Sequence, residues 1–174
     1  YYCASANPQS VTVTSGAAAS VSFTNKLNTG SVKLVKTTNT GENLGGWQID
    51  LYTDSACTSP VTGSPFTTGE DGTITVTGLQ PGTYYAKEAA VTDPYWHCDT
   101  AIKTVTVVSN QTATVTFANT HNGRAKIIKS MPDGGSISGW TFEVRSSDNN
   151  LVGTFTTGED GTILTDYLLP GEYT

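Results

Sequence analysis

An internal repeat is the feature that most restricts how this chain can fold. The eight residues FTTGEDGT occur twice, from Phe66 to Thr73 and from Phe155 to Thr162. Each copy is followed by a Leu-x-Pro-Gly turn, LQPGTYY from Leu79 and LLPGEYT from Leu168. Self-similarity at a fixed spacing indicates structural units of one kind that follow one another along the chain.

The similarity continues on both sides of these motifs. SVKLVK from Ser31 matches RAKIIK from Arg124, and VTVTSGAAASVSFTNK from Val11 resembles VTVVSNQTATVTFANT from Val105. The repeat is about 90 residues long, a common size for a small β-sandwich. We predict three parts: residues 1–28 as the C-terminal part of one module, 29–121 as a complete module, and 122–174 as the N-terminal part of a third.

The chain starts and stops at nearly the same point of the repeat, since Thr174 aligns with Tyr85 and Tyr1 with about Tyr95. Two explanations stay open. One is a proteolytic product cut at an exposed loop of a longer protein. The other is a polymer in which the head of one chain completes the tail of the next by strand complementation.

Alternation of apolar and polar residues predicts strands throughout. Val32, Leu34 and Lys36 share one face of the first segment, and abundant Thr and Val favour strands over helices. The same alternation places Ala113, Val115, Phe117 and Asn119 on one face of the last segment. Because no amphipathic helix is evident, we predict an all-β fold of tandem Greek-key β-sandwich modules, in which Asp71-Gly72 forms a hairpin turn.

Three polar residues occur in phase with the predicted core. Lys36 ends the first inward face, Asn119 ends the last, and Glu88 follows Tyr84 and Ala86 on a third. Burying a charge costs several kcal/mol unless it is paired or neutralised. An uncharged Lys36 amine is a nucleophile, and a protonated Glu88 can polarise the Asn119 carboxamide and move the proton. The expected product is a Lys36–Asn119 amide bond, with loss of ammonia.

The strand endings VKLVK, LQPGTYYAKE and VTFAN carry a resemblance to a known family. The chain resembles the CnaB-type modules of Gram-positive pilins and adhesins, also called SpaA-like or prealbumin-like repeats. In that family the residues matching Lys36, Glu88 and Asn119 form a spontaneous isopeptide bond, with the Glu as promoter. The resemblance also makes Asn25 and Lys129 cross-link candidates in the partial modules.

Ordinary roles stay open for each of these residues. Lys36 can extend to solvent at a strand end or form a salt bridge with Glu88, and Asn119 can close a turn. Cys57 and Cys98 are a disulfide candidate, which suits an oxidising extracellular setting, or two separate thiols, with Cys3 left over.

Other motifs favour structure over chemistry. The two GEDG loops are too short for an EF-hand calcium loop, and turns explain them. Tyr95 and Trp96 beside His97 can stack on a sugar, but packing at the end of the sandwich is the simpler explanation. We expect no metal site and no cofactor.

Composition limits the function classes. The net charge of −6 argues against nucleic acid, and no apolar run is long enough for membrane insertion. We expect an extracellular stalk repeat of a bacterial surface adhesin or pilus, anchored to the cell wall through other regions, with no enzymatic activity beyond its own cross-linking. Its partners would be neighbouring modules, further copies in head-to-tail assembly, and a host or surface ligand. The alternative is a carbohydrate- or protein-binding β-sandwich module.

Overall fold

The computed structural model describes residues 1–174, and its regular structure consists entirely of β-strands. The predicted all-β fold is confirmed. The chain contains no helix long and apolar enough to cross a membrane. The strands are β1 (Tyr2–Cys3), β2 (Asn25–Lys26), β3 (Gly30–Thr38), β4 (Gln48–Tyr52), β5 (Phe66–Thr67), β6 (Thr73–Leu79), β7 (Gly82–Glu88), β8 (Trp96–His97), β9 (Lys103–Val107), β10 (Thr112–His121), β11 (Lys126–Ile128), β12 (Thr141–Arg145), β13 (Leu151–Thr156) and β14 (Thr162–Leu164).

The chain divides into two compact units, and β3 and β10 contribute residues to both. This division does not follow the sequence repeat, so the module boundaries near Asn28 and His121 stay a prediction. The first unit comprises Tyr1–Lys36, Leu44–Ala89 and Ala101–Phe117, and the second comprises Thr37–Asn43, Ala90–Thr100 and Ala118–Thr174.

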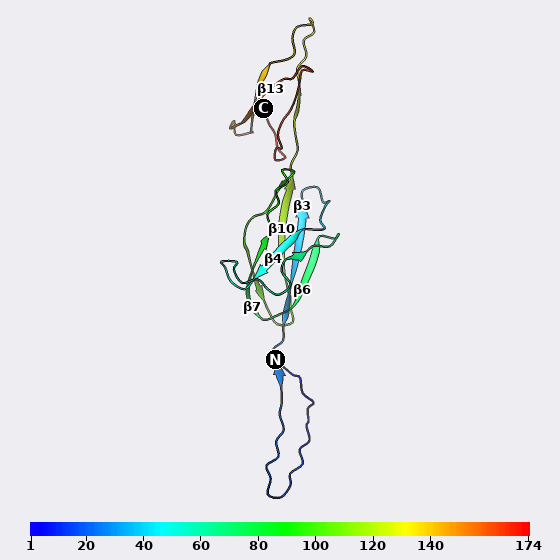
Figure 1. The fold of residues 1–174 in the computed structure, drawn as a ribbon, viewed down its shortest axis with the longest axis vertical. Helices are drawn as coiled ribbons and strands as arrows, with labels where there is room; N and C mark the ends of the chain where they lie inside the picture. Colours follow the sequence, from blue (N-terminus) through cyan, green and yellow to red (C-terminus); the bar gives the residue numbers. More distant parts are fainter. The chain divides into compact units, whose positions relative to one another are not determined.

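Two four-stranded sheets form the β-sandwich. Their strand orders are β6-β3-β10-β8 and β5-β4-β7-β9. Figure 1 shows β3, β4, β6 and β7 gathered in one body. Alternate residues of the strands point into the core between the sheets, as their period of two requires. The core side chains with no exposed surface are Val32, Leu34, Ile49, Leu51, Ala86 and Phe117.

Strands β3 and β10 are hydrogen-bonded neighbours that run in the same direction. The Ser31 N–H donates to the Gln111 carbonyl (2.9 Å) near their starts, and the Asn39 N–H donates to the Asn119 carbonyl (3.2 Å) near their ends. Parallel neighbours need a long crossover connection, which the remaining strands of the sandwich supply here.

The turn at Asp71-Gly72 has the expected backbone but joins different sheets. Gly72 has a positive φ of 75°, which glycine adopts without strain. However, β5 pairs with β4, whereas β6 pairs with β3. The predicted hairpin is therefore wrong. The Lys36 N–H donates to the Gly72 carbonyl (2.7 Å), so the chain is hydrogen-bonded to β3 directly after the turn.

The segment 126–174 reproduces the local geometry of the sandwich. Trp47 N–H donates to Thr68 Oγ1 (3.1 Å), and Trp140 N–H donates to Thr157 Oγ1 (3.0 Å). The hydroxyl of Tyr84 donates to the Gln80 carbonyl (2.9 Å), as that of Tyr173 does to the Leu169 carbonyl (2.8 Å). The sequence repeat therefore corresponds to a repeat of turns and strand contacts.

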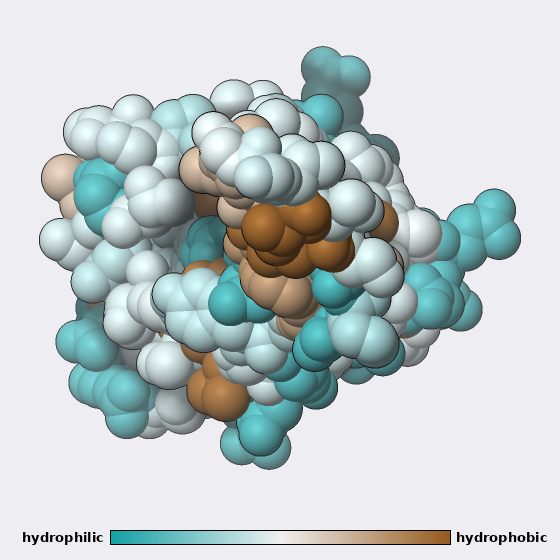
Figure 2. All heavy atoms as spheres, turned by 90° about the horizontal axis from the view of Figure 1, so that it is seen from below, coloured by the Kyte–Doolittle hydropathy of each residue, from teal (hydrophilic) through white to brown (hydrophobic).

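The N-terminal segment has little regular structure. Only β1 and β2 form there, and Cys3 pairs with Asn25. The large apolar side chains that it exposes are Tyr1, Tyr2, Val11, Val13, Val21 and Phe23. Figure 2 shows one face of the molecule on which an apolar area is bordered by hydrophilic groups.

Aromatic side chains gather around residues 121–124. Tyr95 stacks on His121 (ring centroids 5.6 Å apart) and contacts the ring of Tyr167 (4.4 Å). Trp96 meets His121 edge-on (4.9 Å), and the Arg124 guanidinium lies 5.2 Å from the Tyr167 ring centroid. We call Tyr95, Trp96, His121, Arg124 and Tyr167 the aromatic clasp.

Candidate functional site

The three polar residues that follow the core pattern are buried. Lys36, Glu88 and Asn119 are 1%, 4% and 2% exposed. Each is the polar member of a buried alternating series, on β3, β7 and β10 respectively. Strand alternation alone therefore turns these side chains inward, although each carries a group that water would solvate better.

Lys36 and Glu88 form a buried ion pair between the two sheets. Lys36 Nζ donates to Glu88 Oε1 in a short hydrogen bond, and neither side chain is accessible to water. Nζ also lies 4.2 Å from the ring centroid of Trp47, which β4 follows directly. An ion pair in a dry environment interacts strongly but has lost the hydration of both charges. Transfer of the proton to the carboxylate would remove both charges.

Three buried side-chain atoms have no hydrogen-bond partner. They are Glu88 Oε2, Asn119 Nδ2 and, just beyond β10, Asn122 Oδ1. The carbonyl oxygen of the Asn119 amide is satisfied, because the Asp99 N–H donates to Asn119 Oδ1 (2.8 Å). Burial without a partner costs about 1–3 kcal/mol for a polar group. Two of these atoms belong to the polar residues that follow the core pattern, so each calls for an explanation beyond ordinary packing.

The cross-link candidates outside residues 30–121 are placed differently. Asn25 is exposed on β2. Lys129 is half-buried, donates from Nζ to the Ser130 carbonyl (3.3 Å), and lies 4.6 Å from the ring centroid of Trp140. The Lys129–Trp140 contact repeats the Lys36–Trp47 contact. The structure brings neither Asn25 nor Lys129 next to a reaction partner within this chain.

The cysteines belong to different segments of the chain, with Cys3 on β1, Cys57 between β4 and β5, and Cys98 after β8. Cys3 is exposed, whereas Cys57 and Cys98 are each half-buried. Cys57 has a positive φ of 55° in the loop that the carboxylate of Asp54 closes by accepting the N–H groups of Thr58 and Ser59. The Cys57–Cys98 disulfide stays a prediction.

Two contributors to the site were not singled out from the sequence. The role of the Asp99 backbone N–H cannot be predicted from the sequence, because every residue except proline has this group. The other is Trp47, which follows a glycine, and the Gly-Trp pair recurs at Trp140. The equal spacing of Lys36 to Trp47 and of Lys129 to Trp140 is a signal that identifies this contact.

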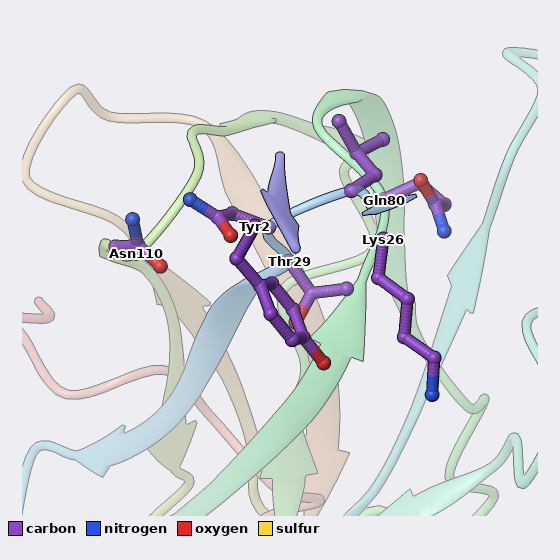
Figure 3. A pocket seen from close by; sticks show the side chains of 7 residues that line it. Tyr2, Lys26, Thr29, Gln80 and Asn110 are labelled. Atoms are coloured by element: carbon purple, nitrogen blue, oxygen red, sulfur yellow. The ribbon is translucent and has the colours of Figure 1, made fainter. Parts of the chain in front are cut away.

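A polar groove of about 490 Å³ lies beside β1 and β2. Figure 3 shows the side chains of Tyr2 and Lys26 from these strands together with those of Thr29, Gln80 and Asn110. No group of three or more His, Cys, Asp or Glu side chains is arranged to hold a metal ion. The buried Lys36–Glu88 pair is therefore the stronger candidate for chemistry.

A sequence profile of the SpaA prealbumin-like fold domain matches residues 30–121 and again residues 123–174. No curated protein matches the chain. Similar solved structures include the Bacillus anthracis TIE protein, with 22% identity over 90% of this chain and 30% of that one and a TM-score of 0.49. A streptococcal ancillary pilin is 23% identical over 86% and 53% of the two chains, with a TM-score of 0.48.

The minor pilin GBS52 of Streptococcus agalactiae is 24% identical over 60% of this chain and 49% of that one, with a TM-score of 0.48. The chain thus spans 30 to 53% of the lengths of these three proteins. The two matches of the profile cover most of the sequence, and they confirm the resemblance that the strand endings indicated. The chain belongs to the SpaA family of prealbumin-like fold domains.

Proposed function

We propose that this chain is part of the stalk of an extracellular bacterial surface protein, and that its complete module cross-links itself through a Lys36–Asn119 amide bond promoted by Glu88. The observation that carries the proposal is the buried Lys36–Glu88 ion pair, which leaves Glu88 Oε2 without a partner. A pair that served stability alone would be expected to satisfy its remaining lone pairs.

The reaction needs no cofactor. The Lys36 ammonium gives a proton to the Glu88 carboxylate, and the neutral amine attacks Cγ of Asn119. The new C–N bond forms as the carbonyl π electrons move to Oδ1. Glu88 gives its proton to Nδ2 and takes one proton from the attacking nitrogen. When the carbonyl re-forms, the bond from Cγ to Nδ2 breaks and Nδ2 leaves as ammonia. Two groups held together in a dry site gain most of their rate from proximity.

Strand register supports the pairing of these two residues. The Asn39 N–H donates to the Asn119 carbonyl, and in a parallel pair this contact places Lys36 level with Phe117. Asn119 is then two residues further along the same face of the neighbouring strand, about 7 Å along its axis. A lysine side chain is long enough to cover this span.

Asn25 and Lys129 extend the proposal to neighbouring modules. The Lys129–Trp140 contact has the geometry of the Lys36–Trp47 contact, so Lys129 is set up as a donor for an asparagine that another segment supplies. That segment is a neighbouring module of the same protein or a second copy in head-to-tail assembly. The cell surface and a host or surface ligand are the setting that membership of the family suggests.

The test is the intact mass of the purified chain under reducing and denaturing conditions. We expect a deficit of one ammonia, and peptide mapping should join Lys36 to Asn119. Asn119→Ala and Glu88→Gln should each show the full unreacted mass, whereas Glu70→Gln, at an exposed position, should react normally. An unreacted wild-type mass would refute the proposed bond, and a covalent multimer would favour bonding through Asn25 and Lys129.

A further inference from the structure

The carboxamide of Asn119 is held unevenly. Its oxygen accepts a hydrogen bond of 2.8 Å from the Asp99 backbone N–H, whereas its nitrogen is buried without an acceptor. The whole residue is only 2% exposed. Ordinary packing would satisfy both ends of a buried amide.

This arrangement matches what attack on an amide carbon requires. Negative charge develops on the oxygen, and a fixed N–H donor aimed at that oxygen stabilises the charge without reorganising. The nitrogen has to leave, and its departure breaks no hydrogen bond. Loss of ammonia also removes buried donors that have no acceptor, which the folded chain otherwise retains at a cost.

We propose that the Asp99 backbone N–H is the oxyanion donor of the cross-linking reaction. This inference rests on the proposed Lys36–Asn119 bond and adds a group that the family resemblance does not assign. As Lys36 Nζ bonds to Cγ, the π electron pair moves to Oδ1 and the hydrogen bond from Asp99 tightens. The pair returns when the bond to Nδ2 breaks, and Asp99 keeps its proton throughout.

The N-terminal copy of this segment shows that the repeat alone does not build the contact. Cys3-Ala4 aligns with Cys98-Asp99, and Asn25 aligns with Asn119. There the Ala4 N–H donates to the Thr24 carbonyl (2.8 Å), and Asn25 is exposed. The donor at Asp99 therefore depends on how the loop before β9 packs over the end of β10.

Replacing the Asp99 amide by an ester tests the role of this one N–H. The chain can be joined by ligation at Cys98 in denaturant, with the α-hydroxy analogue of aspartate at position 99, so that folding starts the reaction. We expect ammonia loss, followed by intact mass, to be about 100-fold slower than in a wild-type chain made in the same way.

A second ester separates catalysis from loss of a loop contact. The Tyr95 N–H, in the loop on the other side of β8, donates to Asp93 Oδ1 (2.9 Å) rather than to Asn119. An ester at Tyr95 should leave the rate within about threefold, far from the loss expected for an oxyanion donor. Equal rates for the Asp99 ester and the wild type would overturn the inference, as would equal slowing by both esters. If the wild type itself loses no ammonia, the proposed bond fails instead.

The hydrogen bond can also be observed before reaction. Glu88→Gln should leave the chain unreacted, and a scalar coupling between the Asp99 amide nitrogen and Asn119 Cγ is then expected by NMR. Detection of the coupling supports the donor role even if the ester chain folds poorly. A folded, unreacted chain without the coupling contradicts it.

Discussion

At the scale of single residues, the site combines groups that are costly to bury and gives each a chemical use. Lys36 and Glu88 have lost their hydration and retain one strong contact with each other. Glu88 Oε2 and Asn119 Nδ2 have no partner. The proposed amide would replace a buried ammonium with a neutral group, so the reaction would stabilise the folded state.

The contribution of the bond to stability can be separated from that of the ion pair. Asn119→Ala removes the electrophile but leaves Lys36 and Glu88 paired. We expect it to lower the free energy of unfolding by about 4–5 kcal/mol, since a cross-link closing a loop of this length restricts the unfolded chain. Lys36→Ala should cost a further 3–5 kcal/mol, roughly, because Glu88 loses its only charged partner.

Urea unfolding and protease sensitivity measure these losses. Asn150→Ala, at an exposed position, is the control and should unfold as the wild type does. An Asn119→Ala variant with wild-type melting and protease resistance would argue against a cross-link.

The buried positions of Lys36, Glu88 and Asn119 followed from alternation, because a strand has only two faces and the neighbouring residues on each are apolar. Alternation does not say which strands are adjacent, so the parallel pairing of β3 and β10 was not predicted. The hairpin at Asp71-Gly72 was wrong for the same reason. The residues of a turn determine the local backbone conformation. They do not determine which strand the following segment pairs with, because that depends on which strand edges are open in the fold.

At the scale of elements, the turn before β6 depends on a carboxylate. Asp71 accepts the Thr73 N–H (2.9 Å) and the Thr73 hydroxyl (2.9 Å). Asp160 does the same with Thr162, at 3.0 and 2.7 Å. Both hydrogen bonds lower the pKa of each Asp below its usual value, and the bond from the threonine hydroxyl has the larger effect.

Stability should therefore change with pH through this turn. A lowered pKa in the folded state contributes stability above the unfolded pKa, about 4, and loses it as the pH falls through the folded value. We expect Asp71→Asn to be destabilised relative to wild type at pH 7 and the difference to shrink below about pH 4. Urea titrations at both pH values measure it. Asn150→Ala, which removes no ionisable group, should show no such trend.

At the scale of the whole molecule, the aromatic clasp orders the chain segment around Arg124, and the rate of tryptic cleavage there measures this order. The Arg124 side chain lies over Tyr167, and its Nε donates to the Thr165 carbonyl. Tyr167 in turn contacts Tyr95, and the neighbouring Tyr95 side chain raises the pKa of Tyr167. The peptide bond after Arg124 is therefore in an ordered segment.

Removing the Tyr167 ring should open this segment. We expect Tyr167→Ala to raise the rate of tryptic cleavage after Arg124 about fivefold, because an aromatic pair contributes about 1 kcal/mol. Tyr167→Phe keeps the ring and should change the rate less. Cleavage after Arg145 serves as the internal reference, and an equal rise at both sites would mean general unfolding rather than loss of the clasp.

The shared direction of β3 and β10 has a mechanical consequence. Tension on the chain enters the module at Gly30 and leaves it at His121, which are the outer ends of two parallel neighbours. Extension must therefore slide one strand along the other and break their hydrogen bonds together, in shear, rather than peel them apart one at a time. The first and last strands thus form a joint that resists elongation through its backbone contacts, whether or not a covalent bond has formed across it.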